Sequence, residues 1–232
     1  MHAKKLIPFF FCTSLLIIVS TTSFSQKGKK FEQKKQNQKG SKNFGNKMSE
    51  LAIPIGNMII GSPTNKSVTA SVILEKDAEG FIEYAIESGK YNYKTSMFKT
   101  TNSEPLEIII NQLKPNSLYY YRLNYRLAGE SKFTVTPESW FATQKNPTTS
   151  FSFGIQGDSH PERVGKMFNS NLYQQTIEHV TEYKPDFYFM LGDDFNIDRL
   201  VASNSATREN VEPIYKTQRY YLGNPGTNPP LY

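Results

Sequence analysis

The sequence is poor in residues that carry thiol or imidazole chemistry. Its 232 residues include one cysteine and three histidines. The cysteine, Cys12, lies in an N-terminal segment that we expect to be removed, so the mature protein would use neither disulfide bonds nor thiolate catalysis. No glycine-rich phosphate loop follows the first apolar run of the α/β pattern described below, which argues against a cytosolic nucleotide-binding protein.

Acidic residues are scarce in the first 50 residues. That segment contains ten lysines and two glutamates, a net charge of +8, whereas the remainder contains 17 basic and 19 acidic residues, a net charge of −2. The basic character therefore belongs to the N-terminal region, and the part that we expect to fold is nearly neutral. This distribution removes the reason to expect a nucleic-acid partner.

A hydrophobic run long enough to cross a membrane is also missing. The apolar stretch 6–19 follows two lysines, is interrupted by Pro8 and gives way to small and polar residues. About 14 residues are fewer than the ~20 that span a bilayer. We therefore interpret residues 1–25 as a signal peptide cleaved after Ser25, with a membrane anchor as the alternative. The mature protein is expected to be secreted or periplasmic, with no stable membrane span.

Residues 26–50 contain few apolar side chains. Lysine, glutamine, asparagine and glycine dominate this segment, which cannot bury enough surface to offset the entropy of ordering it. We expect a disordered basic tether that acts as a solvated spacer. Binding of an anionic polymer or of lipid headgroups is the alternative.

From residue 51 to residue 146 the pattern changes to short runs of β-branched and aromatic residues. Turn signals such as Gly89 and Pro115-Asn116 separate these runs. Several short alternating runs in about 95 residues are typical of an antiparallel β-sandwich. The expected strands cover residues 67–74, 80–87, 104–113, 117–126 and 139–145.

The segment LKPNSLYY, residues 113–120, sharpens this prediction. It places Tyr119 at the start of an expected strand. The segment resembles the tyrosine corner of fibronectin type III and immunoglobulin-like domains, in which a buried phenol bonds to nearby backbone. The resemblance implies this role for Tyr119. The alternative is that the tyrosines form the aromatic face of a strand, and both interpretations predict a sandwich.

The spacing of apolar residues changes after the linker 146–149, and we assign residues 150–232 to an α/β domain. Two apolar runs each end in Gly-Asp, and two longer segments carry apolar side chains at three- and four-residue steps. Strand, helix, strand and helix in this order predict a βαβ unit with parallel strands. The expected elements are strands at 150–158 and 186–194 and helices at 169–185 and 207–222.

Three side chains suited to metal binding follow these two strands. Asp158 and His160 follow the first strand, and Asp193 follows the second. A right-handed βαβ crossover brings both strand ends to the same edge of the sheet, and an extended backbone would point Asp158 and His160 the same way. Two carboxylates and an imidazole are ligands that Zn²⁺, Fe or Mn²⁺ accept. A helix cap at Asp158 is the alternative.

Three further residues of the α/β domain receive weaker predictions. Arg163, in the segment HPER, is a candidate contact for a substrate phosphate. Asp194 is expected to be a solvated loop acid rather than a residue that acts behind the metal ligands. His179 falls inside an expected helix and is expected to lie on the surface.

The pair of motifs resembles a known superfamily. GDSH at residues 157–160, followed by LGDD at residues 191–194, resembles the first two motifs of the calcineurin-like metallophosphoesterases. The preceding sandwich is similar to that of their purple acid phosphatase and PhoD-like members. The resemblance implies a phosphate-ester substrate and two divalent metal ions, without distinguishing Fe, Zn and Mn. It implies that Asp158 and His160 hold one ion and that Asp193 bridges both.

The later motifs of that superfamily are missing from the sequence. These are Gly-Asn-His-Asp/Glu, a single later histidine and Gly-His-x-His. Three ligands are too few for two ions, and a sheet of two strands would leave one face exposed. We therefore expect the N-terminal part of an exported metal-dependent phosphoesterase, inactive as it stands. The alternative is a secreted binding module with a degenerate phosphoesterase remnant.

Overall fold

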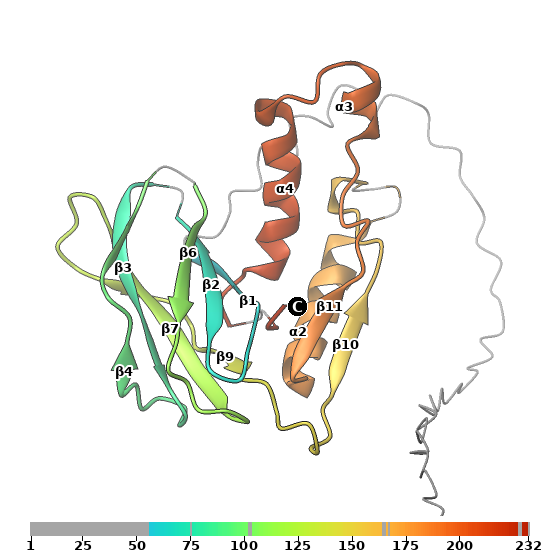
Figure 1. Ribbon diagram of the computed structural model, residues 1–232. Helices are drawn as coiled ribbons and strands as arrows, with labels where there is room; N and C mark the ends of the chain where they lie inside the picture. Colours follow the sequence, from blue (N-terminus) through green and yellow to red (C-terminus); the bar gives the residue numbers. More distant parts are fainter. Residues whose placement is uncertain are drawn as a thin grey trace, which may run out of the picture. The chain divides into compact units, whose positions relative to one another are not determined.

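The computed structural model describes residues 56–74, 76–101, 104–163, 166, 168–226 and 229–231 (Figure 1). The signal peptide predicted at residues 1–25 and the tether predicted at residues 26–50 lie outside the described residues. None of the helices in the described part of the chain combines the length and the hydrophobicity needed to span a bilayer.

Two antiparallel sheets form the first part of the described chain. One sheet has the strand order β1-β2-β6. The other has the order β4-β3-β7-β8, with β5 also pairing with β3 and β9 with β7. The strands are β1 (Asn57–Gly61), β2 (Val68–Ile73), β3 (Ala78–Ala85), β4 (Tyr93–Lys94), β5 (Phe98–Thr100), β6 (Leu106–Ile110), β7 (Leu118–Leu127), β8 (Thr134–Val135) and β9 (Ser139–Ala142).

The predicted β-sandwich is confirmed. The five strands expected from the sequence correspond to β2, β3, β6, β7 and β9, with ends that differ by a few residues. Strands β1, β4, β5 and β8 were not predicted. Three of these have only two or three residues, which is too short to display an alternating pattern.

Alternate side chains of the two sheets build the core of the sandwich. Val68, Ala70 and Val72 of β2 are fully buried, and the residues between them are partly exposed. They belong to one cluster with Ile82 of β3 and Leu123 of β7 in the other sheet. Full burial of one such valine or leucine side chain stabilises a fold by roughly 1.5–3 kcal/mol, so the two-residue period of the sequence determines which faces meet.

The predicted tyrosine corner is confirmed. Tyr119 is buried, and its hydroxyl accepts a hydrogen bond of 2.9 Å from the backbone N–H of Lys114. The Tyr119 ring stacks on Phe141 of β9 with 5.4 Å between ring centroids. The phenol therefore fixes the loop before β7 while its ring fills the core.

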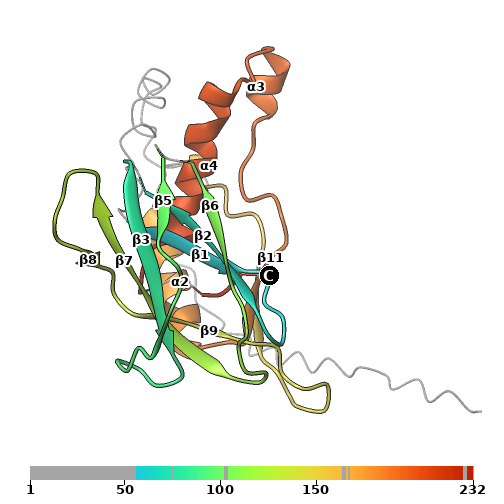
Figure 2. The same cartoon turned by 60° about the vertical axis from the view of Figure 1, so that its left-hand side comes forward.

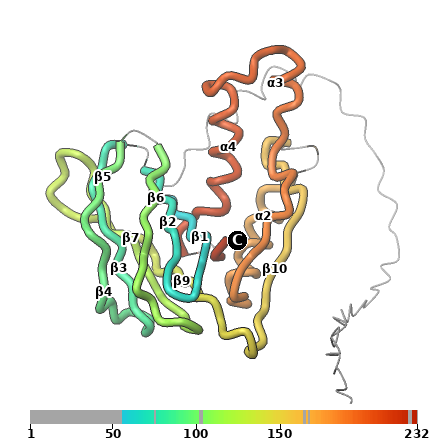
Figure 3. The backbone as a smooth tube through the Cα atoms, in the orientation of Figure 1, coloured from blue at the N-terminus to red at the C-terminus, as the bar shows by residue number. Residues whose placement is uncertain are grey.

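A parallel pair of strands joined by a helix forms the second part. Strand β10 (Phe153–Gln156) pairs in parallel with β11 (Phe187–Met190), and α2 (Ser170–Tyr183) lies between them in the chain (Figure 3). The Asn169 side chain accepts a hydrogen bond from the Leu172 N–H at the start of α2. The helix ends at Lys184, which has a left-handed conformation. The predicted βαβ order is therefore present.

Three further helical segments complete this part of the chain. One of them, α4 (Arg208–Leu222), shares a second hydrophobic core with α2 and β11, which contains Phe168, Tyr173, Ile177, Tyr188, Tyr221 and Leu222. The other two are η1 (Pro161–Arg163) and α3 (Asp198–Ala202). The helix predicted at 207–222 corresponds to α4, whereas the short α3 was not predicted.

The C-terminal end of α4 lies against the sandwich at β1 (Figures 1 and 2). The backbone N–H of Met58 donates to the carbonyl of Gly223 at 3.0 Å, and the Asn57 amide donates to the carbonyl of Arg219 at 2.9 Å. The Arg219 guanidinium in turn donates to the carbonyl of Ser71 in β2 at 2.6 Å. Hydrogen bonds therefore join the end of α4 to β1 and β2 of the sandwich.

One face of the β10–β11 sheet is apolar and exposed, as the sequence predicts for a sheet of two strands. Phe153, Ile155 and Phe189 expose 48%, 55% and 37% of their surface. Phe151 and Leu191, which flank the strands, are also exposed. On the opposite face Tyr188 is buried in the core with α2. We call these five exposed residues the outer apolar face.

Candidate functional site

The two loops that carry the predicted metal ligands leave the sheet at the same edge. The pairing of β10 and β11 ends with Gln156 opposite Met190, and the Leu191 N–H then donates to the Gln156 carbonyl at 2.8 Å. Asp158 follows β10 by two residues, and Asp193 follows β11 by three. The parallel pairing predicted from the sequence therefore brings both Gly-Asp motifs to one edge.

The backbone at the three predicted ligands is left-handed rather than extended. The φ angles are 40° at Asp158, 45° at His160 and 51° at Asp193. The extended backbone that would point Asp158 and His160 the same way is therefore not present. Residues other than glycine adopt positive φ uncommonly, with asparagine, aspartate and histidine the most frequent among them, and such residues gather at functional sites.

His160 is the most enclosed of the three predicted ligands. Asp158 and Asp193 are exposed, whereas His160 is half-buried. The Nδ1 atom of His160 lies 3.0 Å from Oε1 of Glu162, and the same oxygen accepts a hydrogen bond of 3.0 Å from the backbone N–H of Asn196. The imidazole is therefore anchored on the side away from its Nε2 atom.

Asp194 lies inside the site rather than in solvent, so the expectation of a solvated loop acid is wrong. It is half-buried, and its Oδ1 atom is buried without a hydrogen-bond partner among the described residues. Burial is the main cause that raises the pKa of Asp194, and repulsion from Asp193 and Asp158 adds to it, while the Ser159 hydroxyl and His160 act in the opposite direction. Asp158, Asp193 and His160 are thus close enough to act on the Asp194 carboxyl.

Ser159 connects this edge to the second core. Its hydroxyl lies 3.2 Å from the backbone carbonyl of Asp194 and 3.2 Å from Oε1 of Gln218 on α4. The Tyr173 hydroxyl on α2 accepts from the Gln156 amide at 2.8 Å. Sequence reasoning did not identify Gln218, because it follows Ser159 by 59 residues and no local pattern connects them.

The predictions for His179 and Arg163, and for a complete metal site, have different outcomes. His179 is exposed on α2, as expected. Arg163 is half-buried, with its Nε atom 3.6 Å from Oε1 of Glu162, and its contact with a phosphate stays a prediction. In the portion of the chain that is described, no three histidine, cysteine, aspartate or glutamate side chains are grouped closely enough to hold a metal ion. The predicted ligands therefore share an edge without forming a closed coordination shell.

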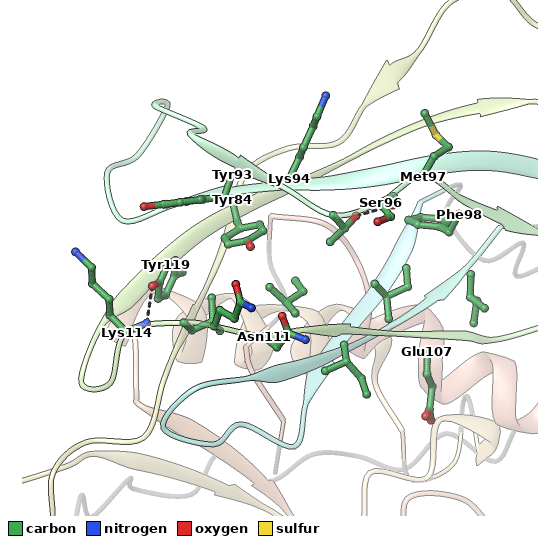
Figure 4. A pocket seen from close by; sticks show the side chains of 17 residues that line it. Tyr84, Tyr93, Lys94, Ser96, Met97, Phe98, Glu107, Asn111, Lys114 and Tyr119 are labelled. Atoms are coloured by element: carbon green, nitrogen blue, oxygen red, sulfur yellow. Dashed lines mark hydrogen bonds between the residues drawn. The ribbon is translucent and has the colours of Figure 1, made fainter.

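A hollow of about 600 Å³ lies elsewhere, on the sandwich (Figure 4). Its walls are the segment from Tyr93 to Phe98 and the segment from Leu106 to Lys114, with Tyr84 and Tyr119 between them. None of the predicted metal ligands lines it. The hollow and the edge with the Gly-Asp loops are therefore separate features.

Comparisons with known proteins show only partial likeness. No family model matches the chain, and no curated protein matches it. The structure of PhoD resembles it with a TM-score of 0.43 and 13% identity, over 75% of this chain and 37% of that chain. This chain therefore spans little more than a third of the PhoD structure.

Two smaller structures resemble part of the chain. A fibronectin type III domain from the human KIAA0970 protein has a TM-score of 0.33 and 13% identity, over 50% of this chain and 91% of that chain. The sensor domain of the anti-sigma factor RsgI4 of Pseudobacteroides cellulosolvens has a TM-score of 0.32 and 15% identity, over 42% of this chain and 82% of that chain.

Proposed function

We propose that the chain carries part of the metal centre of an exported, metal-dependent phosphoester hydrolase. In this proposal Asp158 and His160 are ligands of one divalent ion and Asp193 bridges to a second. The observation that supports it most directly is the arrangement of the two Gly-Asp loops at one edge of a parallel strand pair, where Asp158, Asp193 and His160 all act on the pKa of Asp194.

The donor set fits a divalent cation in its chemistry. Carboxylate oxygens and an imidazole nitrogen suit Zn²⁺, Fe and Mn²⁺. Asp158 and Asp193 repel the Asp194 carboxylate, and Asp194 has a buried oxygen without a partner within the described ranges. A cation at this edge would relieve that repulsion. When bound, such ions activate water and neutralise charge on phosphoryl oxygens.

The residues of the chain have distinct parts in this proposal. In this proposal the exposed Asp158 and Asp193 supply carboxylate ligands, and the half-buried His160 supplies an imidazole nitrogen. The half-buried Asp194 adds negative charge next to these ligands. The guanidinium of Arg163, close to Glu162, is proposed to contact a phosphate oxygen, because arginine matches phosphate in charge and geometry.

Metal titration tests the proposal. Calorimetric titration of the protein with Mn²⁺ or Zn²⁺ is expected to show binding that weakens by at least about tenfold in Asp158→Asn, His160→Gln and Asp193→Asn, since removal of a ligand costs more than the 10–100-fold loss typical of its supporting residues. The matched control is Glu178→Gln, which changes a carboxylate on the surface of α2. Equal affinity of all four variants would refute the metal site.

A second measurement connects the metal to phosphate chemistry. In the presence of Mn²⁺, the ³¹P relaxation of inorganic phosphate is expected to be faster with the protein than with Asp158→Asn or Asp193→Asn. Arg163→Gln is expected to reduce the effect while leaving Mn²⁺ affinity unchanged. Tight Mn²⁺ binding without any effect on phosphate would leave a cation site and would refute the phosphoester assignment.

A secreted binding module is the second candidate function. The observation that favours it is the hollow of about 600 Å³ on the sandwich, which is within the 300–1,000 Å³ range of small-molecule sites. In that case the sandwich binds the ligand, and the Gly-Asp loops bind no metal. The metal titration separates the two candidates.

A further inference from the structure

Glu162 and His160 form a buried pair within the turn that follows β10. Their side chains expose 9% and 12% of their surface, and His160 Nδ1 lies 3.0 Å from Glu162 Oε1. The turn is closed by a hydrogen bond of 2.9 Å from the Arg163 N–H to the His160 carbonyl, which places the two side chains together. A carboxylate oxygen accepts hydrogen bonds, so we assign the proton of this contact to Nδ1.

The same carboxylate oxygen also holds the loop after β11. Oε1 of Glu162 accepts the backbone N–H of Asn196 at 3.0 Å, three residues beyond Asp193. The residues between β10 and η1 carry Asp158 and His160, and the residues between β11 and α3 carry Asp193. One oxygen atom therefore joins the two loops that bear the predicted ligands.

We propose that Glu162 is a positioning residue for this edge. It holds His160 in the tautomer that is protonated at Nδ1, which leaves the Nε2 lone pair available to a ligand, and it keeps the loop of Asp193 in register with that nitrogen. Carboxylates that accept the second ring N–H of a metal-binding histidine act in this way. The part that concerns a metal rests on the function proposed above, whereas the tautomer and the loop register do not.

The buried position of Glu162 is unfavourable for its second carboxylate oxygen. The second oxygen, Oε2, is buried and has no hydrogen-bond partner in the described part of the protein. A buried carboxylate with an unpartnered oxygen destabilises a fold. A glutamine amide would accept the same two hydrogen bonds without the charge. What Oε1 of Glu162 provides is one acceptor shared by His160 Nδ1 and the Asn196 N–H, with the Arg163 Nε atom 3.6 Å away.

The tautomer of His160 tests the inference directly. We expect ¹⁵N NMR of ring-labelled protein at pH 8, without metal, to show His160 protonated at Nδ1 and unprotonated at Nε2. Glu162→Gln is expected to keep this tautomer, and Glu162→Ala is expected to give a mixture that includes protonation at Nε2. His179 on the exposed surface of α2 serves as an internal reference, and Glu138→Ala removes a hydrogen-bonded carboxylate in the sandwich as a control.

Metal affinity supplies the second readout. Glu162→Ala is expected to weaken Mn²⁺ or Zn²⁺ binding by about 10–100-fold, with a smaller loss for Glu162→Gln and none for Glu138→Ala. If wild type binds no metal but shows the Nδ1–H tautomer, the proposed function fails and the positioning role stands. Protonation of wild-type His160 at Nε2, or an unchanged tautomer in a folded Glu162→Ala, would overturn the inference. Should Glu162→Ala not fold, the wild-type tautomer decides alone.

Discussion

Glu138 shows how a single carboxylate can fix a turn of the sandwich. Its two oxygens accept hydrogen bonds from the Ser88 hydroxyl at 2.6 Å, the Gly89 N–H at 2.9 Å and the Tyr91 hydroxyl. Burial alone would raise the pKa of Glu138, but these hydrogen bonds, with the charge of Lys184, outweigh it and hold the pKa below its ordinary value of 4.5. The ionised form is therefore favoured by folding.

This shift predicts a pH-dependent contribution of Glu138 to stability. Because the pKa is lower in the folded state, the contribution is present above the ordinary pKa and is lost as the pH falls through the folded-state pKa. Glu138→Gln is expected to lower the free energy of unfolding by about 1 kcal/mol at pH 7 and by much less at pH 3, as measured by urea denaturation. An equal difference at both pH values would contradict this account.

Tyr91 gives the complementary prediction at high pH. Burial, followed by its hydrogen bond to Glu138, raises the pKa of Tyr91 to about 12. Removing the acceptor charge is therefore expected to make ionisation of Tyr91 easier. An ultraviolet titration of Glu138→Gln, with Tyr91→Phe used to identify the signal, should show one tyrosine whose pKa has decreased from about 12. An unchanged curve would show that Glu138 does not influence the phenol.

At the scale of elements, the end of α4 depends on a small residue. Gly223 follows the last residue of the helix, and a Cβ atom there would lie 2.3 Å from Oδ1 of Asn57. Asn57 is fully buried and donates to the carbonyl of Arg219, so it has no room to move away. The close approach of α4 to β1 therefore requires glycine at this position.

Gly223→Ala is expected to destabilise the protein by about 2 kcal/mol, the usual size of an overpacking effect. The melting temperature should fall by about 4–8 °C. The control is Gly157→Ala, which would meet no atom within 4 Å and is expected to change stability by less than about 0.5 kcal/mol. Equal melting temperatures for the two variants would show that α4 and β1 do not pack in this way.

Local patterns in the sequence predicted the long elements but not how they meet. Helix α2 was predicted from apolar positions at helical spacing, a signal whose members lie within a few residues of each other. The contact of Asn57 with Arg219 joins residues 162 apart, and no local pattern reports such a pairing. The same limit applies to β4 and β8, whose two residues each are defined by their partner strands.

The candidate site was predictable to the same extent. The positions of Asp158, His160 and Asp193 at the ends of paired strands followed from the order of apolar runs. Their left-handed backbone did not, because aspartate and histidine also occur in extended loops. The link from Glu162 to Asn196 spans 34 residues, so the proposed positioning residue had no signal in the sequence except its nearness to His160.

At the scale of the whole molecule, the outer apolar face of the β10–β11 sheet places a group of apolar side chains in contact with solvent. Phe153 stacks on Phe187 with 5.4 Å between ring centroids, and Phe189 lies edge-on to both. A contiguous group of exposed aromatic and aliphatic side chains is unusual on a monomeric soluble protein. Parallel strands in particular are rarely left with one face uncovered.

Self-association is the expected consequence of this face. The double variant Phe153→Ser/Phe189→Ser is expected to sediment as a monomer at concentrations where wild type forms larger species, and to bind less of a dye that reports exposed apolar surface. The control is Leu172→Ser/Val201→Ser, which removes two side chains on α2 and α3 that are 62% and 59% exposed and lie outside the outer apolar face. Because all four side chains are at least one-third exposed, neither double variant should lower the melting temperature by more than a few degrees. If both double variants sediment like wild type, contacts through the outer apolar face do not govern the behaviour of the molecule in solution.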